Sequence, residues 1–206
     1  FDRVPAGGQP VPYKFRIERA GQGPDAGWER GRNRSLRLDQ ASPRIARAFD
    51  VPDEPAALRR TGTIERLGLV ASAHVAARDV QVWLPPGYDP AGATRHPVIY
   101  AHDGQNLFDP RLAAFGTDWG LDEAIVELCA RTACTPPIVV AVWNTPDRRR
   151  EYCPWGLGDR YAAFLIDELM PKVNAEFRTR TDTTATMTLG SSMGGLISFH
   201  LCRTHP

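Results

Sequence analysis

The chain has 206 residues, of which 42% are hydrophobic, and its 25 Lys and Arg residues nearly balance its 24 Asp and Glu residues, for a formal net charge of +1. This length suits one good hydrophobic core, or a small module joined to part of a larger one. The charge balance gives no reason to expect nucleic acid as a partner, and no stretch approaches the ~20 apolar residues of a membrane span. We therefore expect a globular protein with no nucleic-acid partner and no membrane span.

The first 60 residues differ in character from the rest. They are rich in Gly, Pro, Arg and Asp, and only residues 13–17 and 35–38 alternate as strands do. A polar loop between them carries Trp28, for which stacking on a sugar and ordinary loop packing are both open. We predict that residues 1–60 form a partial β-sandwich-like module that ends in a Pro-containing linker.

From residue 61 onward the pattern becomes regular. Strand-like runs cover residues 64–75, 78–84, 98–101, 138–143 and 183–189, and helix-like runs cover residues 122–131, 159–177 and 195–202. A short Ala-rich turn separates the first two strand-like runs, which indicates an antiparallel pair, and Pro171 is expected to bend or restart the long helix. Strands that alternate with helices predict an α/β fold with a mostly parallel sheet and flanking helices.

The most specific motif is Gly190-Ser191-Ser192-Met193-Gly194, a G-x-S-x-G pentapeptide between the last strand-like run and the last helix-like run. A serine at such a junction is the nucleophile elbow of an α/β-hydrolase, where a strained turn lifts the hydroxyl away from the backbone. Gly190 and Gly194 leave room for the turn and for close contact between the strand and the helix. We expect the Ser192 hydroxyl to lie exposed above the end of its strand.

Four blocks of sequence, found in this order, point to a wider likeness: residues 82–88 (VWLPPGY), 102–109 (HDGQNLFD), 151–155 (EYCPW) and 190–195 (GSSMGG). Together they resemble the putative-esterase family of α/β-hydrolases, which includes siderophore esterases of the enterochelin type, feruloyl and acetyl-xylan esterases, S-formylglutathione hydrolases and mycolyltransferases. The resemblance implies an α/β-hydrolase domain over residues 61–206 that is incomplete at its C-terminus. Residues 11–40 are similar to the tail of a starch-binding-type β-sandwich, a kind of module that precedes some esterases.

This resemblance implies a serine carboxylic-ester hydrolase that forms an acyl-enzyme on Ser192 and needs no metal and no organic cofactor. Its substrate would be a small-molecule or carbohydrate ester of the carbohydrate-linked, phenolic or siderophore type. An acyltransferase of the same fold is one alternative, and a non-catalytic carbohydrate-binding protein on a hydrolase scaffold is another. By analogy, the sandwich-like front module favours a secreted or periplasmic protein, and the oligomeric state stays open.

The oxyanion that forms when Ser192 attacks an ester needs backbone N–H donors. One donor is expected from Met193, the residue after the nucleophile, and the other from the loop after the third strand of the fold, at Gly104 or Gln105. Glycine suits that loop because it lets the backbone approach a substrate closely. We therefore predict an oxyanion hole formed by Met193 with Gly104 or Gln105.

Substrate contacts are expected from Asp103, Tyr152 and Trp155, near the loops at the carboxyl ends of the strands, where open α/β sheets bind ligands. Aromatic rings there, including that of Trp143, suit a phenolic acyl group or a sugar face, and packing in the core or rim explains them equally well. For Asp103, ordering of its own loop and a role as catalytic acid are the alternatives. The basic run at 148–150 is expected to be a solvated loop.

The proton acceptor for Ser192 is the missing part of this site. In this fold the acid and then the histidine follow the serine, and few residues follow Gly194. His200 would lie about 12 Å along the same helix, which is too far, so it is expected to pack or to cap. His102 is expected to support its loop, with a substrate contact as the alternative. We predict that the triad acid and histidine are absent from this sequence and that it does not hydrolyse esters alone.

The four cysteines lack the spacing of metal ligands. Cys129 and Cys202 fall on apolar helix faces and are expected to be buried. A disulfide between Cys134 and Cys153 is compatible with the sequence, which does not otherwise support it.

Overall fold

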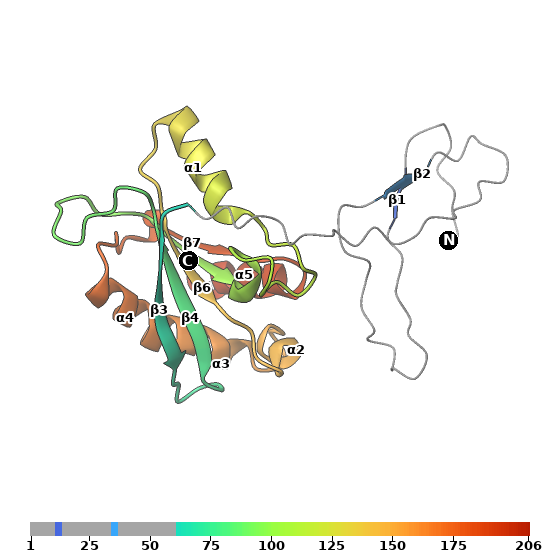
Figure 1. Ribbon diagram of the computed structural model, residues 1–206. Coiled ribbons are helices and arrows are strands. Elements are labelled where there is room, and N and C mark those ends of the chain that lie inside the picture. The colour runs from blue at the N-terminus through green and yellow to red at the C-terminus, as the bar shows by residue number, and fades with distance from the viewer. Residues whose placement is uncertain (1–10, 14–33, 37–60) are drawn as a thin grey trace.

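The computed structural model describes residues 11–13, 34–36 and 61–206 (Figure 1). The two short segments are β1 (Val11–Tyr13) and β2 (Arg34–Leu36), which pair antiparallel. They overlap the strands predicted at residues 13–17 and 35–38 by one and two residues, and Trp28 and the predicted linker lie outside the described residues. The division of the chain into a front module and a second domain therefore stays a prediction.

A five-stranded sheet in the order β3-β4-β6-β5-β7 forms the centre of the fold. Its strands are β3 (Thr63–Val70), β4 (Arg78–Leu84), β5 (Val98–His102), β6 (Ile138–Val142) and β7 (Thr186–Leu189). β4 runs antiparallel to both of its neighbours, and β5 runs parallel to β6 and β7. The sheet is therefore mixed: β4 runs against the other four strands, and its pairing with β3 is the predicted antiparallel pair.

Two predicted strands are longer than the observed ones. The run at 64–75 ends at Val70, because the hydroxyl of Ser72 accepts hydrogen bonds from the backbone N–H groups two and three residues later and so closes a turn. The run at 183–189 begins as a 3-10 turn, η3 (Thr183–Ala185), and becomes a strand only at Thr186. Local hydrogen bonding therefore overrides the β-type composition at these ends.

Helices cover both faces of the sheet (Figure 1). One face is covered by α1 (Leu121–Thr132), and the other by α3 (Gly158–Ala163), the π-helical segment η2 (Phe164–Leu169), α4 (Met170–Glu176) and α5 (Met193–Thr204); η1 (Gly104–Asn106) and α2 (Arg148–Glu151) are single turns. The predicted helix at 159–177 is thus α3, η2 and α4 in succession. Pro171 follows the end of η2, where its missing N–H coincides with the change in hydrogen-bonding pattern. Among the described residues, no helix is both long and apolar enough to cross a membrane.

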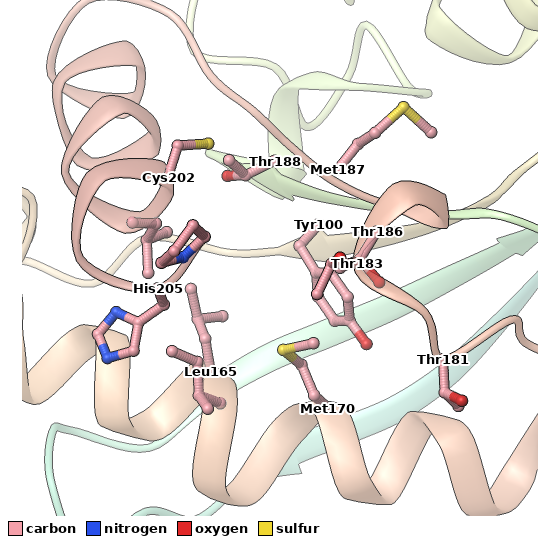
Figure 2. Close-up of a pocket in the computed structure, with 13 residues that line it drawn as sticks. Tyr100, Leu165, Met170, Thr181, Thr183, Thr186, Met187, Thr188, Cys202 and His205 are labelled. Carbon is pink, nitrogen blue, oxygen red and sulfur yellow. The ribbon is translucent and has the colours of Figure 1, made fainter.

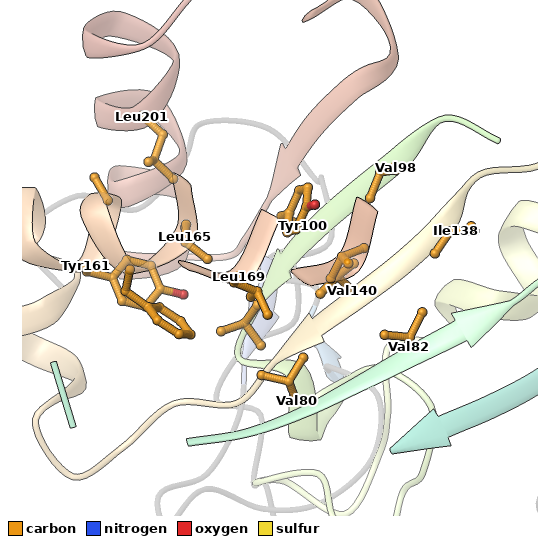
Figure 3. Close-up of a cluster of buried hydrophobic side chains, with 14 of the residues drawn as sticks. Val80, Val82, Val98, Tyr100, Ile138, Val140, Tyr161, Leu165, Leu169 and Leu201 are labelled. Carbon is orange, nitrogen blue, oxygen red and sulfur yellow. The ribbon is translucent and has the colours of Figure 1, made fainter. Parts of the chain in front are cut away.

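Side chains at alternating strand positions form two buried clusters, one on each face of the sheet. β6 contributes to both and is fully buried along its length, as its apolar run predicts. Figure 3 shows the larger cluster, in which strand residues face α3 and η2. Val80, Val82, Val98, Tyr100, Ile138 and Val140 lie across from Tyr161, Leu165 and Leu169. Burial on both faces makes the sheet a rigid base for the loops at its strand ends.

A buried ion pair ties β4 to α2. The Arg78 guanidinium donates to both carboxylate oxygens of Glu151, at 2.7 and 3.1 Å, and the two side chains are 0% and 1% exposed. The hydroxyl of Thr145 also donates to Glu151, and the guanidinium carbon lies 5.1 and 5.0 Å from the ring centroids of Tyr161 and Phe164. Because both charges are out of water, neither tolerates the loss of its partner.

The cysteine predictions are corrected by the structure. Cys129 and Cys134 form a disulfide, with their Cα atoms 4.8 Å apart, so Cys134 does not pair with Cys153, which is free. The bond forms because α1 ends at Thr132 and the next residue, Ala133, adopts a left-handed conformation (φ 53°) that turns the chain back. Cys202 is free and exposed rather than buried.

Replacement of Glu151 by Ala should lower the free energy of unfolding by about 3–5 kcal/mol, because it leaves the Arg78 charge buried without its partner. Urea denaturation measures the change. As a control, Lys172→Ala removes the exposed ion pair with Glu176 and should cost no more than about 1 kcal/mol. Equal losses in the two variants would show that burial of the Arg78–Glu151 pair has no special effect.

Candidate active site

Ser192 lies in a sharp turn between β7 and α5, at the carboxyl end of its strand. Its backbone angles are φ 55° and ψ −118°, and the residue is exposed to solvent. A positive φ is uncommon for a residue with a Cβ, and holding one costs on the order of 1–3 kcal/mol. An exposed, strained turn between a strand and a helix is the geometry that the G-x-S-x-G motif predicts.

The turn closes because its glycines lack side chains. A Cβ on Gly190 would overlap the backbone of Gly194, whose Cα would be only 2.8 Å away, and no change of rotamer relieves such a contact. A Cβ on Gly194 would lie 3.3 Å from Oδ2 of Asp103 and 3.4 Å from Cβ of His102. The elbow therefore packs backbone against backbone, and it lies beside the loop that follows β5.

The loop after β5 carries the other expected oxyanion donors. It begins with Asp103 in the left-handed conformation (φ 59°, ψ 43°) and continues as η1. A Cβ on Gly104 would overlap the carbonyl carbon of Ala141 in β6, so the position requires glycine. Met193 opens α5, and its N–H belongs to the first helical turn, where donors have no partner within the helix. These donors therefore come from the same end of the sheet as Ser192.

The Asp103 carboxylate is buried and engaged through both oxygens. Oδ1 accepts hydrogen bonds from Nδ2 of Asn144 and Nε of Arg148, each at 2.6 Å, and Oδ2 accepts from Nη2 of Arg148 at 2.7 Å. The backbone N–H of Asp103 donates to the Tyr152 hydroxyl at 3.2 Å. The hydrogen bonds from Arg148 to Asp103 raise the pKa of the guanidinium, which therefore stays charged. Three side chains thus hold one aspartate beside the elbow.

Asn144 and Arg148 both follow β6, and Arg148 belongs to the basic run at residues 148–150, which was expected to be a solvated loop. The structure corrects this expectation for residues 148–150: Arg148 opens α2 and bonds to buried Asp103, whereas Arg149 is exposed. The sequence signal for the contacts of Asn144 and Arg148 with Asp103 was the position of these residues just after their strands. β5 and β6 are parallel neighbours, so polar residues that follow the two strands meet at the same edge of the sheet.

His102, the last residue of β5, is fully buried inside a chain of hydrogen bonds. Its Nδ1 lies 2.9 Å from the Tyr161 hydroxyl and its Nε2 lies 3.0 Å from Oγ1 of Thr188. Thr188 donates to Ser198, which donates to the carbonyl of Gly194, so we assign the ring proton to Nε2. Burial lowers the pKa of His102 from 6.5 to about 4, which keeps the ring neutral. These hydrogen bonds join His102 to α3, to β7 and, through Thr188, to α5 rather than to its own loop, so its support of that loop stays a prediction.

The three residues expected to contact the substrate differ in exposure. Trp155 is 82% exposed, whereas Tyr152 and Asp103 are buried. The Tyr152 ring packs 5.5 Å from the ring of His102 and lies under the guanidinium of Arg148, at 5.1 Å. Trp155 is therefore available at the surface, whereas Tyr152 and Asp103 are not. Their part in substrate binding stays a prediction.

Two exposed aromatic residues that the sequence analysis did not single out lie on the loop between η1 and α1. Phe115 is 55% exposed and Trp119 is 38% exposed. Asn106 of η1 holds this loop, because its backbone carbonyl accepts the Trp119 N–H at 2.9 Å and its side-chain oxygen accepts the Ala114 N–H at 2.8 Å. The signal for them is two aromatic residues among the small and polar residues of 113–120.

A cavity of about 530 Å³ lies between β7, η2 and the C-terminal end of α5 (Figure 2). Its lining includes Tyr100, Met170, Met187 and Cys202, but neither Ser192 nor the loop after β5. The cavity is therefore distinct from the candidate active site. Neither there nor elsewhere among the described residues do three or more His, Cys, Asp or Glu side chains form a group that could hold a metal ion.

Replacement of Gly190 by Ala should disrupt the elbow, because the new methyl group meets fixed backbone; we expect a loss toward the upper end of about 1–3 kcal/mol in the free energy of unfolding. Gly195→Ala is the matched control, since its Cβ would meet the nearest atom, the carbonyl oxygen of Gly190, at an ordinary 3.4 Å. Thermal and urea unfolding measure both variants. Equal stability of the two would contradict the packing described for the turn.

The buried His102 predicts a dependence of stability on pH. Since its pKa is lowered to about 4, the folded protein binds this proton less readily than the unfolded chain. The contribution of His102 to stability should therefore fall as the pH drops from about 6.5 to 4 and change no further below that. A shift of this size is worth about 3 kcal/mol. His102→Gln keeps a donor and an acceptor but cannot charge, so it should weaken the pH dependence of urea unfolding. If the pH dependence of the free energy of unfolding is the same in His102→Gln, the lowered pKa of His102 is not its cause.

The chain is similar in sequence to a curated protein and in fold to solved structures. It is 24% identical over 142 residues to "Uncharacterized protein YbbA" of Bacillus subtilis (strain 168), a match that covers 63% of this chain and 52% of that protein. Siderophore hydrolase EstB from Aspergillus nidulans superposes with a TM-score of 0.54 at 22% identity, over 75% of this chain and 56% of that chain. The ferulic acid esterase AmCE1/Fae1A from Anaeromyces mucronatus superposes with a TM-score of 0.51 at 21% identity, over 73% and 58%. The chain therefore spans a little over half the length of these proteins.

The family model described as "Putative esterase" matches residues 73–206, which is well over half of the chain. The matched region includes the elbow, the loop after β5 and α2. The solved structures share the α/β-hydrolase arrangement of a mixed sheet between helices, which confirms the predicted fold class. The chain belongs to the "Putative esterase" family and has the fold of the α/β-hydrolases.

Proposed function

We propose that this chain carries the nucleophile of a serine carboxylic-ester hydrolase. The observation that carries the proposal is Ser192 itself, which is exposed and held at φ 55° between β7 and α5. A binding protein has no need of an exposed serine on a strained turn, whereas an enzyme gains from a hydroxyl raised clear of the backbone. Membership of an esterase family supports the same reaction class.

In the proposed reaction, Oγ of Ser192 attacks the carbonyl carbon of an ester and its proton passes to a base. The negative charge that develops on the carbonyl oxygen is stabilised by the backbone N–H of Met193 and by that of Gly104 or Gln105. Collapse of the tetrahedral intermediate expels the alcohol, which takes up the proton, and leaves the acyl group on Ser192. Water then attacks the acyl-enzyme and releases the acid.

The base in this proposal is a histidine outside these 206 residues. Among the described residues no side chain is hydrogen-bonded to the Ser192 hydroxyl. The chain has five histidines: His102 is buried with both nitrogens engaged, and His200 Nε2 bonds to Asp159 at 2.7 Å. His205 lies at the other end of α5, roughly 20 Å along the helix axis, and His74 and His96 contact other segments. We therefore expect no measurable ester hydrolysis by residues 1–206 alone.

We propose Trp155 as the residue that meets the substrate directly, because its ring is the one among the three candidates that solvent reaches. A flat indole suits a phenolic ring or a sugar face. The similar structures are those of a siderophore hydrolase and a ferulic acid esterase, which supports a carbohydrate-linked, phenolic or siderophore-type ester as the substrate class. Asp103 and Tyr152 would act from behind the surface, by holding the loop that donates to the oxyanion.

Replacement of Ser192 by Ala, in the protein expressed from the whole gene, should abolish labelling by a fluorophosphonate and lower the hydrolysis of a p-nitrophenyl ester by at least about 10³-fold, because the acyl group has no acceptor. Ser191→Ala is the matched control, since its side chain is also exposed and lies one residue earlier. It should retain most of the labelling. Persistent labelling of the Ser192→Ala variant would mean that the nucleophile lies elsewhere.

A further inference from the structure

The left-handed backbone of Asp103 has to be held by its surroundings. A residue with a Cβ rarely adopts this conformation, and Asp103 does so at the point where β5 ends and the oxyanion loop, our name for Asp103 to Asn106, begins. Hydrogen bonds to the Asp103 side chain hold the backbone in this conformation. Arg148 grips the carboxylate with two parallel hydrogen bonds, at 2.6 and 2.7 Å, and Asn144 adds a third at 2.6 Å.

The same restraint extends to the residues that follow Asp103. Its backbone carbonyl accepts the N–H of Asn106 at 2.9 Å and so closes the turn that contains Gly104 and Gln105. The side-chain oxygen of Gln105 accepts the backbone N–H of Asn144 at 3.3 Å. The segment after β6 thus holds the turn at two places, on Asp103 and on Gln105.

The gripped carboxylate also lies against the nucleophile helix. Oδ2 of Asp103, one of the two oxygens bonded to Arg148, is 3.3 Å from the position that a Cβ on Gly194 would occupy. The carboxylate is therefore packed between the oxyanion loop and the first turn of α5, which carries Met193. A change in its orientation would alter the spacing between the two sets of N–H donors.

We propose that Arg148 is a positioning residue, whose two-pronged pair with Asp103 sets the orientation of the Gly104 and Gln105 N–H groups relative to Ser192. The inference rests on the proposed function. Arg148 is suited to this role rather than to binding a substrate, because its Nε and Nη2 are committed to Asp103 and its guanidinium lies over the Tyr152 ring. A lysine could supply the positive charge but not the two parallel hydrogen bonds of a planar guanidinium. The proposed role therefore requires the shape of the arginine side chain as well as its charge.

The test compares Arg148→Gln, Arg148→Lys and Asp103→Asn in the protein expressed from the whole gene. Misplaced donors weaken transition-state binding more than substrate binding, so kcat and the rate of fluorophosphonate labelling should fall about 30- to 100-fold in Arg148→Gln, with KM within about 2-fold of the original value. Arg148→Lys should restore only part of the loss. Asp103→Asn combined with Arg148→Gln should be little worse than either alone, because both break the same pair.

Arg111→Gln is the matched control, since Arg111 makes two hydrogen bonds of the same kind to the Asp109 carboxylate, at 3.0 and 2.8 Å, on the loop between η1 and α1. It should change kcat less than about 2-fold. The proposal fails if Arg148→Gln keeps kcat within 2-fold of the original value. If the glutamine variant does not fold, the same criterion applies to Arg148→Lys and Asp103→Asn. The proposal also fails if KM alone rises, because Arg148 would then be a substrate contact. Full recovery by lysine would likewise overturn it. Failure of the proposed function would be seen in a different measurement, because the Ser192→Ala variant would then still be labelled by the fluorophosphonate.

Discussion

Close approach of backbone to backbone at the carboxyl ends of β5, β6 and β7 is the constraint on which the site depends. Gly104 packs against the chain of β6, and Gly190 packs against Gly194 in the first turn of α5. These contacts leave no space for a methyl group, so they fix how far the Ser192 turn lies from the loop after β5. The strain at Ser192 persists because the backbone around it is packed too closely to yield: a Cβ on Gly190 would overlap the backbone of Gly194.

Three buried polar interactions supply much of the remaining order, and in each the partners match in charge. Arg78 meets Glu151, Arg148 meets Asp103, and the neutral ring of His102 bridges Tyr161 and Thr188. Removing such groups from water is costly unless they are paired, so every pair restricts the loops to one arrangement. The pairs join segments far apart in sequence. Through them the end of β6 determines the conformation of the loop after β5.

Much of the fold follows from sequence patterns, because they are local. β4 was predicted at its observed bounds and β6 to within one residue, since an apolar run marks a strand buried on both faces. The elbow was predicted from five residues whose steric roles are fixed. The grip of Arg148 on Asp103 was not, because it depends on which strands are neighbours. The disulfide between Cys129 and Cys134 was missed because it follows from a left-handed residue just after α1.

That disulfide also shows how little some covalent links contribute to a fold. Cys129 and Cys134 are separated by five positions, so the bond closes a very small ring. In the chain-entropy picture, a ring of this size restricts the unfolded chain only slightly, by about 2 kcal/mol, less than a bridge between distant segments would. Cys129 lies in the last turn of α1 and Cys134 in the loop that follows it, and none of the contacts described around Ser192 involves either cysteine. The geometry of the elbow is therefore independent of whether the protein resides in an oxidising or a reducing compartment.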